Sequence, residues 1–296
     1  MRIFICVDDT DDLTKSTSTG KISELIARSL VDTGGTLIKG VTRHQLLLHA
    51  DIDYTSHNSS MCMELQIDDP NLSSIQANAE DILRKNMAET SAPGLCFCIS
   101  EELNDPDSLM AFGRRAQKEI LTKQEAYALA EKIGGTTLKE YGGTGMGIIG
   151  ALAGVGLRLS GCDGTFRGGK DNIYEGQTLT VKELLGHIDI QQVLNFNGEP
   201  LDETTEITLK DQLKLAHLDH KRTLIAKQKN GKYFACKKKE LYDGNNKLNT
   251  WHTTCKYFVE DNDIDEQYDD TSRACYNCLY RRWTANGFIC IKPNQE

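Results

Sequence analysis

Residues 3–20 read IFICVDDTDDLTKSTSTG, and this stretch indicates how the chain begins to fold. Its first five residues are apolar and mostly β-branched or aromatic, which is typical of a buried strand. The strand runs directly into clustered negative charge and then into hydroxyl side chains. The aspartates are Asp8, Asp9, Asp11 and Asp12, and the hydroxyl residues are Ser16, Thr17, Ser18 and Thr19. A buried strand is therefore expected to end in an acidic loop.

The acidic loop has two interpretations. Carboxylates this close together repel one another, so they either raise one another's pKa or bind a cation. Mg²⁺ suits such a cluster, because it takes oxygen ligands and is usually held by one or two carboxylates together with substrate phosphates. The alternative is a solvated loop that caps the next helix, since charged loops are common on protein surfaces.

The size and composition of the chain indicate a globular protein that is not embedded in a membrane. With 296 residues, 39% hydrophobic and 26% charged, the chain can form two domains with a sizeable core. No segment approaches the roughly 20 apolar residues that a membrane helix needs. The start of the sequence lacks the long apolar stretch of a signal peptide, so a cytoplasmic protein is expected. Its ten cysteines are then expected to be thiols or metal ligands rather than disulfides.

Charge is distributed unevenly along a chain whose net charge is −9. Residues 214–239 carry nine Lys or Arg residues against one Asp, whereas residues 260–270 are strongly acidic. The 214–239 basic block is a candidate docking face for RNA, including tRNA, or for other phosphate-bearing partners. The alternative is a solvated surface that pairs with the acidic segment of the same chain.

Strand and helix patterns alternate over the first half of the chain. The expected strands are 2–7, 36–50, 59–68 and 94–100, and the expected helices are 20–31, 71–86, 108–120 and 124–133. This alternation predicts an α/β or α+β domain with a mixed sheet over residues 1–168. A polar, Gly-rich linker is expected at 167–172.

The second half is expected to contain a small β-rich basic module at 174–240 and a tail rich in cysteine and aromatic residues at 241–296. In the module, 178–185 resembles a capped short helix, and 193–196 and 223–226 are strand-like. The Asn-Gly pair at 230–231 lies between two apolar runs, which is a strong signal for a β-hairpin.

Residues 141–156, YGGTGMGIIGALAGVG, form a second distinctive motif. Glycines let backbone N–H groups approach a phosphate, and the N-terminus of a helix favours an anion. The motif matches neither a Walker loop nor a dinucleotide fingerprint. The alternative is a turn that leads into a tightly packed helix, because its small residues permit close approach.

Together the acidic loop and the Gly-rich motif resemble the archaeal tRNA-Ile agmatinylcytidine synthetase family over about residues 1–165, and Pro93-Gly94 also matches. Members of that family use ATP and agmatine to modify a cytidine of the tRNA anticodon. Their N-terminal kinase-like domain also phosphorylates one of its own threonines. Residues 170–296 do not match the family's nucleic-acid-binding OB-fold and zinc ribbon, so the resemblance is confined to the first half.

The resemblance implies a role for each matching residue. It assigns Asp8, Asp9 and Asp11 to Mg²⁺ and the ATP phosphates, and Thr19 to the position of the phosphorylated threonine. The remaining nucleotide contacts would be Thr10, Thr17, Ser18, Gly142, Gly143, Gly145 and Gly147. Three positions depart from the family: Thr17 replaces a cysteine, Gly20 replaces a tyrosine, and His57 takes the place of the family's basic residue.

The tail contains a candidate zinc site. Cys275 and Cys278 form a CxxC pair, which suits one half of a tetrahedral site, and Cys255 and Cys290 are the candidates for the other half. Unligated thiols and an iron–sulfur cluster are the alternatives. The tail's aromatic residues either stack on nucleic-acid bases or form the core of the tail.

The sequence therefore favours an ATP- and Mg²⁺-dependent kinase-like enzyme that acts on an RNA base or a small molecule. Its reaction would be phosphoryl transfer or a ligase-type tRNA modification, with agmatine or another small amine as a partner. The alternative is a nucleic-acid-binding accessory protein with a nucleotide-sensing N-terminal domain. A third interpretation is a structural scaffold with a vestigial site.

Overall fold

The computed structural model describes residues 1–11, 17–47, 49, 51–52, 58–68, 71–167, 176–187, 189–195, 198–209 and 213–235, together with the backbone of 281–284 and 287–290. The chain divides into two compact units, residues 1–167 and residues 168–296. Most of the expected linker and the cysteines at 255, 275 and 278 lie outside the described residues.

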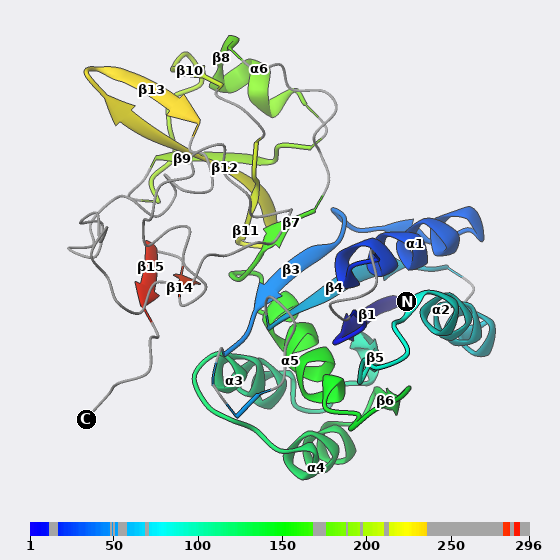
Figure 1. Cartoon of the computed structure of the whole chain (residues 1–296). Coiled ribbons are helices and arrows are strands. Elements are labelled where there is room, and N and C mark those ends of the chain that lie inside the picture. The colour runs from blue at the N-terminus through cyan, green and yellow to red at the C-terminus, as the bar shows by residue number, and fades with distance from the viewer. Residues whose placement is uncertain are drawn as a thin grey trace, which may run out of the picture. The chain divides into compact units, whose positions relative to one another are not determined.

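The first unit is built on an antiparallel sheet with β1 at its centre (Figure 1). β1 pairs with β4 on one side and β5 on the other. The order of the strands is β6-β5-β1-β4-β3-β7, and β2 also pairs with β4. The strands are β1 (Arg2–Asp8), β2 (Thr36–Leu37), β3 (Thr42–Gln45), β4 (Ser59–Gln66), β5 (Gly94–Ile99), β6 (Thr136–Glu140) and β7 (Thr165–Phe166).

Two details of this sheet differ from the sequence-based expectation. The single strand expected at 36–50 is wrong: β2 and β3 are separate short strands. Lys39 and Gly40 lie between them with φ angles of 62° and 95°, which interrupt the extended backbone. The pattern also gave no indication of β6, whose mixed polar residues pair with β5 at the edge of the sheet. The expected combination of helices with a sheet is confirmed.

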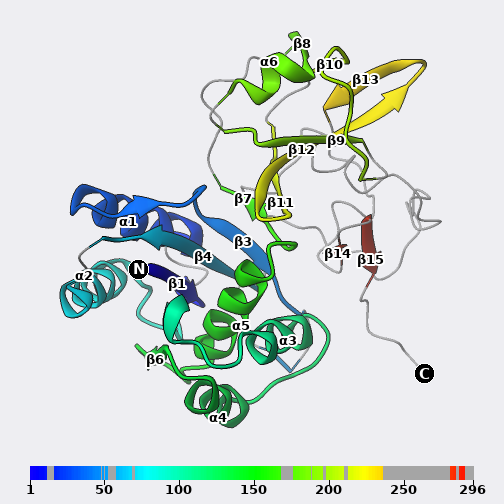
Figure 2. The same cartoon turned by 180° about the vertical axis from the view of Figure 1, so that it is seen from behind.

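Helices cover both faces of the sheet. α1 and α2 pack on one face, α5 packs on the other, and α3 and α4 pack against α5 (Figures 1 and 2). Ile3, Ile5 and Val7 face α1 and α2, whereas Phe4 and Cys6 face α5. Because both faces are buried, β1 has an uninterrupted apolar sequence. The helices are α1 (Thr19–Asp32), α2 (Leu72–Asn86), the 3-10 helix η1 (Ser100–Glu102), α3 (Pro106–Ala116), α4 (Lys123–Ile133) and α5 (Gly147–Leu159).

Polar side chains cap the N-termini of four of these helices. Ser18 caps α1 by accepting a hydrogen bond from the backbone N–H of Lys21, and Asn71 and Asp105 cap α2 and α3 in the same way. At α4, Thr122 and Glu125 form a reciprocal capping box. Each cap satisfies N–H groups that the helix itself leaves without a partner. α5 begins without a side-chain cap, so its first N–H groups need other acceptors.

Glycines on α5 allow the helix to lie directly on the sheet. A Cβ atom at Gly147 would be 2.9 Å from the carbonyl oxygen of Asp8, and one at Gly154 would overlap the side chains of Cys6 and Ser60. Gly156 faces α3 equally closely, because a Cβ there would overlap the Leu109 carbonyl. The tightly packed helix that the Gly-rich motif suggested is therefore present.

The second unit contains a group of strands and a short helix. β11, β12, β13, β10 and β8 are adjacent in that order, and β9 pairs with β12 in parallel. The hairpin predicted at Asn230-Gly231 is confirmed: it joins β12 to β13, and both residues have positive φ, 51° and 77°. The elements are β8 (Thr178–Thr180), α6 (Val181–Leu185), β9 (Gln192–Asn195), β10 (Glu206–Thr208), β11 (Ala216–Leu218), β12 (Lys221–Lys229), β13 (Lys232–Ala235), β14 (Arg281–Thr284) and β15 (Gly287–Cys290).

No helix among the described residues is both long enough and apolar enough to span a bilayer.

The contact between α5 and the sheet predicts the effect of Gly154→Ala. The added methyl group would meet Cys6 and Ser60, both of which are completely buried. We expect the free energy of unfolding in urea to fall by about 1–3 kcal/mol, although alanine is the better helix former. Gly142→Ala is the control, because its Cβ would come no closer than 3.3 Å to any neighbour. Equal stability of the two variants would contradict close packing at Gly154.

Candidate functional site

Four segments meet where β1 ends at Asp8. Asp8 lies opposite Gly94 in the register of β1 and β5. The Thr10 carbonyl accepts a hydrogen bond from the N–H of Ala88 (2.9 Å), and the Ala92 carbonyl accepts one from Gly147 (3.1 Å). The acidic loop, the segment 88–93 and the beginning of α5 are thus joined by backbone hydrogen bonds. The fourth segment, the beginning of α1, joins through a side-chain contact of Thr10.

Asp8 is a buried carboxylate held against α5. Only 7% of the residue is exposed, and Oδ1 accepts a hydrogen bond from the N–H of Asp9 at 2.9 Å. A Cβ atom at Gly150 would overlap Oδ2, so glycine is needed at that position. Burial raises the pKa of Asp8 well above its ordinary value, and the negative charges of Asp9 and Asp11 raise it further. The ionised form of Asp8 is therefore unfavourable unless a cation compensates it.

Asp9 and Asp11 continue the acidic loop and are partly exposed. Asp9 has a φ of 55°, a left-handed conformation that Asp tolerates better than most residues. Within the part of the chain that the structure describes, no three His, Cys, Asp or Glu side chains are grouped closely enough to hold a metal ion. The three aspartates therefore do not form a complete metal cage by themselves.

Thr10 and Thr19 connect the acidic loop to α1 through their hydroxyl groups. The Thr10 hydroxyl donates to Thr19 Oγ1 at 3.0 Å, and both residues are buried. Thr19 is the first residue of α1, and its carbonyl accepts a hydrogen bond from the Ser23 hydroxyl. Ser18 is exposed and serves as the helix cap, and Thr17 is half-buried. The structure thus brings Thr10 and Thr19 together and gives Ser18 a capping role.

The Gly-rich loop forms a tight turn before α5. Gly143 and Gly145 have positive φ angles of 49° and 67°, and the N–H of Gly145 donates to the Gly142 carbonyl. Lys123 Nζ holds the turn by donating to the Thr144 carbonyl at 2.8 Å and to Glu140 Oε2 at 2.7 Å.

The first N–H groups of α5 already have acceptors within the protein. Gly147 donates to Ala92, Ile148 to Gly145 and Ile149 to Met146, at 3.0–3.4 Å. These three donors are therefore engaged in the fold rather than presented to a phosphate, although a helix N-terminus is generally a favourable place for an anion. The helix dipole remains directed at the end of β1, where Asp8 lies.

Arg167 is a candidate site residue that the sequence pattern assigned to the linker. Its backbone N–H donates to the Val41 carbonyl at 2.9 Å, and its Nε donates to Glu24 Oε1 at 3.2 Å. The guanidinium group lies against Gly20, where a Cβ atom would overlap it. A cation is thereby placed one residue beyond Thr19, at the first turn of α1. In the sequence, only the glycine at position 20 could have indicated that another group packs against this turn.

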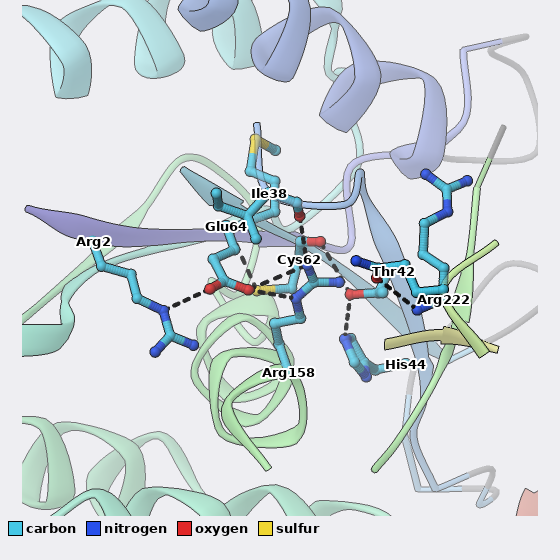
Figure 3. A network of polar contacts seen from close by, with 10 residues as sticks. Arg2, Ile38, Thr42, His44, Cys62, Glu64, Arg158 and Arg222 are labelled. Carbon is cyan, nitrogen blue, oxygen red and sulfur yellow. Dashed lines mark hydrogen bonds and ion pairs between the residues drawn. The ribbon is translucent and has the colours of Figure 1, made fainter. Parts of the chain in front are cut away.

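A buried ion pair fixes the other end of α5 (Figure 3). Arg158, only 1% exposed, contacts Glu64 Oε2 at 3.3 Å and donates to the Ile38 carbonyl at 2.8 Å. Glu64 also accepts a hydrogen bond from Arg2. Burial lowers the pKa of Arg158, while Glu64 counteracts this shift. Because α5 is anchored here and at Ala92, the position of Gly150 over Asp8 is fixed from both ends.

A second set of polar contacts lies beside this ion pair. His44 Nε2 is 2.7 Å from the Thr42 hydroxyl (Figure 3). On the other side of the ring, His44 Nδ1 is 2.8 Å from Asp163 Oδ1. Gln117 donates to the other oxygen of Asp163 at 2.9 Å. These contacts attach the loop after α5 to β3 and α3.

Four cysteines of the first unit, Cys6, Cys62, Cys96 and Cys98, are buried in its core, whereas Cys162 is exposed. Cys6 lies directly opposite Cys62 on one neighbouring strand and Cys96 on the other. Burial raises the pKa of the thiols of Cys6 and Cys96, and that of Cys98 to about 12, so all three are expected to be protonated and unreactive. The zinc site predicted at Cys255, Cys275, Cys278 and Cys290 lies outside the residues whose side chains the structure describes.

Comparisons with known proteins relate part of this fold to solved structures. No family model matches the sequence. No curated protein matches it either. Apo TiaS, an agmatidine synthetase for an isoleucine tRNA, is 23% identical over 53% of this chain and 35% of its own, with a TM-score of 0.45. A complex of TiaS with this tRNA and ATP is 24% identical over 53% and 36%, with a TM-score of 0.46.

A third structure, a complex of TiaS with the tRNA, AMPCPP and agmatine, is 21% identical over 63% of this chain and 44% of its own, with a TM-score of 0.46. This chain therefore matches less than half the length of each of these proteins. The likeness concerns the fold of about half of this chain.

The buried carboxylate predicts a pH-dependent effect of Asp8→Asn on stability. The pKa of Asp8 is higher in the folded state than its ordinary value of 3.8, so the folded state binds the proton more tightly than the unfolded state. Stability is therefore lost as pH rises from below 3.8 through the raised pKa. Asparagine keeps the oxygen that accepts from Asp9 but carries no charge.

In urea unfolding without metal, we expect Asp8→Asn to be more stable than the wild type at about pH 7, by about 1 kcal/mol or more, and equally stable near pH 3. Asp32→Asn is the control, because Asp32 is exposed at the end of α1 and should alter stability little at either pH. A destabilised Asp8→Asn at neutral pH would show that the carboxylate is already compensated within the protein.

Proposed function

We propose that the first unit is a Mg²⁺- and ATP-dependent enzyme whose nucleotide phosphates bind between the acidic loop and the beginning of α1. The observation that supports this proposal is the buried Asp8 carboxylate, whose raised pKa is caused by burial and by Asp9 and Asp11. A protein stabilises such a group by protonation or by a cation. The exposed edge of the acidic loop, at Asp9 and Asp11, gives a cation access.

The donor atoms fit magnesium. Mg²⁺ prefers oxygen ligands and commonly keeps several positions for phosphate oxygens and water. Asp8 and Asp9 are adjacent in sequence, and Asp11 adds charge close by, so one or two carboxylates are available to such an ion. When bound, Mg²⁺ would neutralise charge that develops on the transferred phosphoryl group.

The beginning of α1 supplies the positive side of the proposed site. The first turn of α1 contains no acidic residue, so its N-terminal dipole is not compensated by the helix itself. Arg167 places a guanidinium group against Gly20 in the same turn. Phosphates located between this turn and the acidic loop would meet Mg²⁺ on one side and Arg167 on the other.

Thr19 is the proposed phosphoryl acceptor. Because Thr10 donates to Thr19 Oγ1, the proton of the Thr19 hydroxyl is left to point elsewhere, which suits a hydroxyl that must attack phosphorus. In such a transfer, Thr19 Oγ1 would form a bond to the γ-phosphorus as the bond to ADP breaks, and a neighbouring carboxylate would take the proton. Positioning and charge stabilisation would supply most of the catalysis.

The substrate of the complete reaction is proposed by analogy. The solved TiaS complexes contain an isoleucine tRNA, ATP, an ATP analogue and agmatine, as their names state. We propose the same classes of partner here: an RNA base activated by phosphoryl transfer, and agmatine or another small amine that replaces the phosphate. A zinc site in the tail remains part of this proposal.

A nucleotide-sensing accessory protein is the second candidate. Two observations favour it: Thr19 is only 7% exposed, and the first N–H groups of α5 are engaged within the fold. A protein of this kind would bind ATP without transferring its phosphate.

Mass spectrometry after incubation with Mg²⁺ and ATP separates the two candidates. We expect phosphate on Thr19 in the wild type, and a loss of about 100-fold or more in Asp8→Asn, because removing a group that stabilises transition-state charge typically costs that much. Asp32→Asn is the matched control and should be phosphorylated normally. ATP binding without any phosphorylation would favour the accessory protein, and no ATP binding at all would contradict both.

Arg167→Met tests the positive side of the site. Methionine preserves much of the apolar stem but removes a charge-assisted contact worth about 1.5–3 kcal/mol. We therefore expect the Kd for Mg²⁺-ATP in calorimetry to rise about 10-fold to 150-fold. Arg28→Met removes an exposed arginine from the same helix and should leave ATP binding unchanged. Equal Kd values for Arg167→Met and the wild type would place the phosphates elsewhere.

A further inference from the structure

The outer face of the β12–β13 hairpin gathers lysines around an aromatic ring. In the antiparallel register, Lys227 lies opposite Phe234, and Lys229 lies opposite Lys232. Because side chains alternate along a strand, these four residues share one face of the hairpin. In Figures 1 and 2 the hairpin is the long yellow element of the second unit.

The inner face of the hairpin is buried near its base, whereas both faces are accessible near its tip, where Gln228 is exposed and Tyr233 is half-exposed. On the inner face, Leu224, Ala226 and Ala235 are completely buried. On the outer face, Lys229 and Lys232 are exposed, and Lys227 and Phe234 are half-exposed. Phe234 is therefore partly exposed on the face that carries these ammonium groups. Thr208 lies opposite Phe234 on the neighbouring strand β10 and extends the same face with a hydroxyl group.

The hairpin uses only part of the 214–239 basic block. Arg222 is buried on the inner face, where its Nη1 is 3.4 Å from Asp189. The lysines at 237–239 lie outside the described residues. The block is thus not one continuous basic surface. Lys227, Lys229 and Lys232 are its members on the outer face of the β12–β13 hairpin.

These three lysines carry charge that the described residues do not compensate. No ion pair joins any of them to an acidic group in the parts of the chain that the structure describes. Lys229 and Lys232 are directly opposite each other, and like charges in that position destabilise a sheet. In a chain whose net charge is −9, such a local concentration of positive charge is best explained by an anionic partner.

We propose that the outer face of the β12–β13 hairpin binds single-stranded RNA. Lys227, Lys229 and Lys232 would contact phosphates, and the partly exposed Phe234 would stack on a base. A base inside a duplex has both faces covered, so stacking on a protein ring requires an unpaired base. The inference rests on the proposed function for RNA as the class of nucleic acid, but the binding itself needs neither ATP nor the acidic loop.

Fluorescence anisotropy of the full chain with a labelled oligouridine of about 12 nucleotides tests this proposal. We expect binding that weakens as salt rises from about 50 to 200 mM, with a slope of about −2 for three phosphate contacts. The triple variant Lys227→Gln, Lys229→Gln, Lys232→Gln should lose that dependence and bind at least about 10-fold more weakly. Phe234→Leu should weaken binding about 5-fold to 150-fold without changing the slope, because stacking contributes about 1–3 kcal/mol per base.

A matched triple variant, Lys85→Gln, Lys118→Gln, Lys132→Gln, removes the same charge from the first unit and should bind like the wild type. Wild-type binding by the hairpin triple variant would overturn the proposal. Equal affinity for a duplex of the same length, or preference for vesicles of anionic phospholipid, would also overturn it. Asp8→Asn should bind the oligouridine normally. Loss of the ATP-dependent reaction can therefore be distinguished from loss of RNA binding by the hairpin.

Discussion

The close contact between α5 and the central strand β1 is the constraint on which the first unit depends. Gly150 and Gly154 leave no side chain between helix and sheet, so Asp8 and Cys6 lie directly beneath the helix backbone. Arg158 fixes the far end of the helix through Glu64, and the Ala92 carbonyl fixes its beginning. A helix held at both ends determines where the carboxyl end of β1 lies and what surrounds it.

This constraint also shapes the surroundings of the proposed cation and nucleotide site at the end of β1. Burial under α5 makes the charge of Asp8 unfavourable, and Asp9 and Asp11 increase that effect. On the opposite side lie the first turn of α1, which contains no acidic residue, and Arg167, which also pairs with Glu24. In the proposed phosphoryl transfer, these groups and the aspartates would flank the buried hydroxyl pair of Thr10 and Thr19.

Elements could be predicted from the sequence where the local pattern of residues determines the structure. The apolar run of β1, the helical spacing in α1 and the Asn-Gly turn at 230–231 all had local causes, so their elements could be predicted. β6 and Arg167 could not be predicted, because each depends on a distant partner: β5 for the polar edge strand, and Gly20 for the guanidinium group. The Gly-rich motif allowed two interpretations, and only the packing of α5 showed how Gly147 and Gly154 are used.

A crystal structure with bound metal and nucleotide would show whether a divalent cation and ATP phosphates bind where β1 ends. Crystals grown with Mn²⁺ in place of Mg²⁺ and a non-hydrolysable ATP analogue would locate the metal by its anomalous signal. We expect a peak about 2.0–2.3 Å from a carboxylate oxygen of Asp8 or Asp9, with the phosphates between the metal and Arg167. Nucleotide bound elsewhere, or a metal peak remote from the acidic loop, would contradict this expectation.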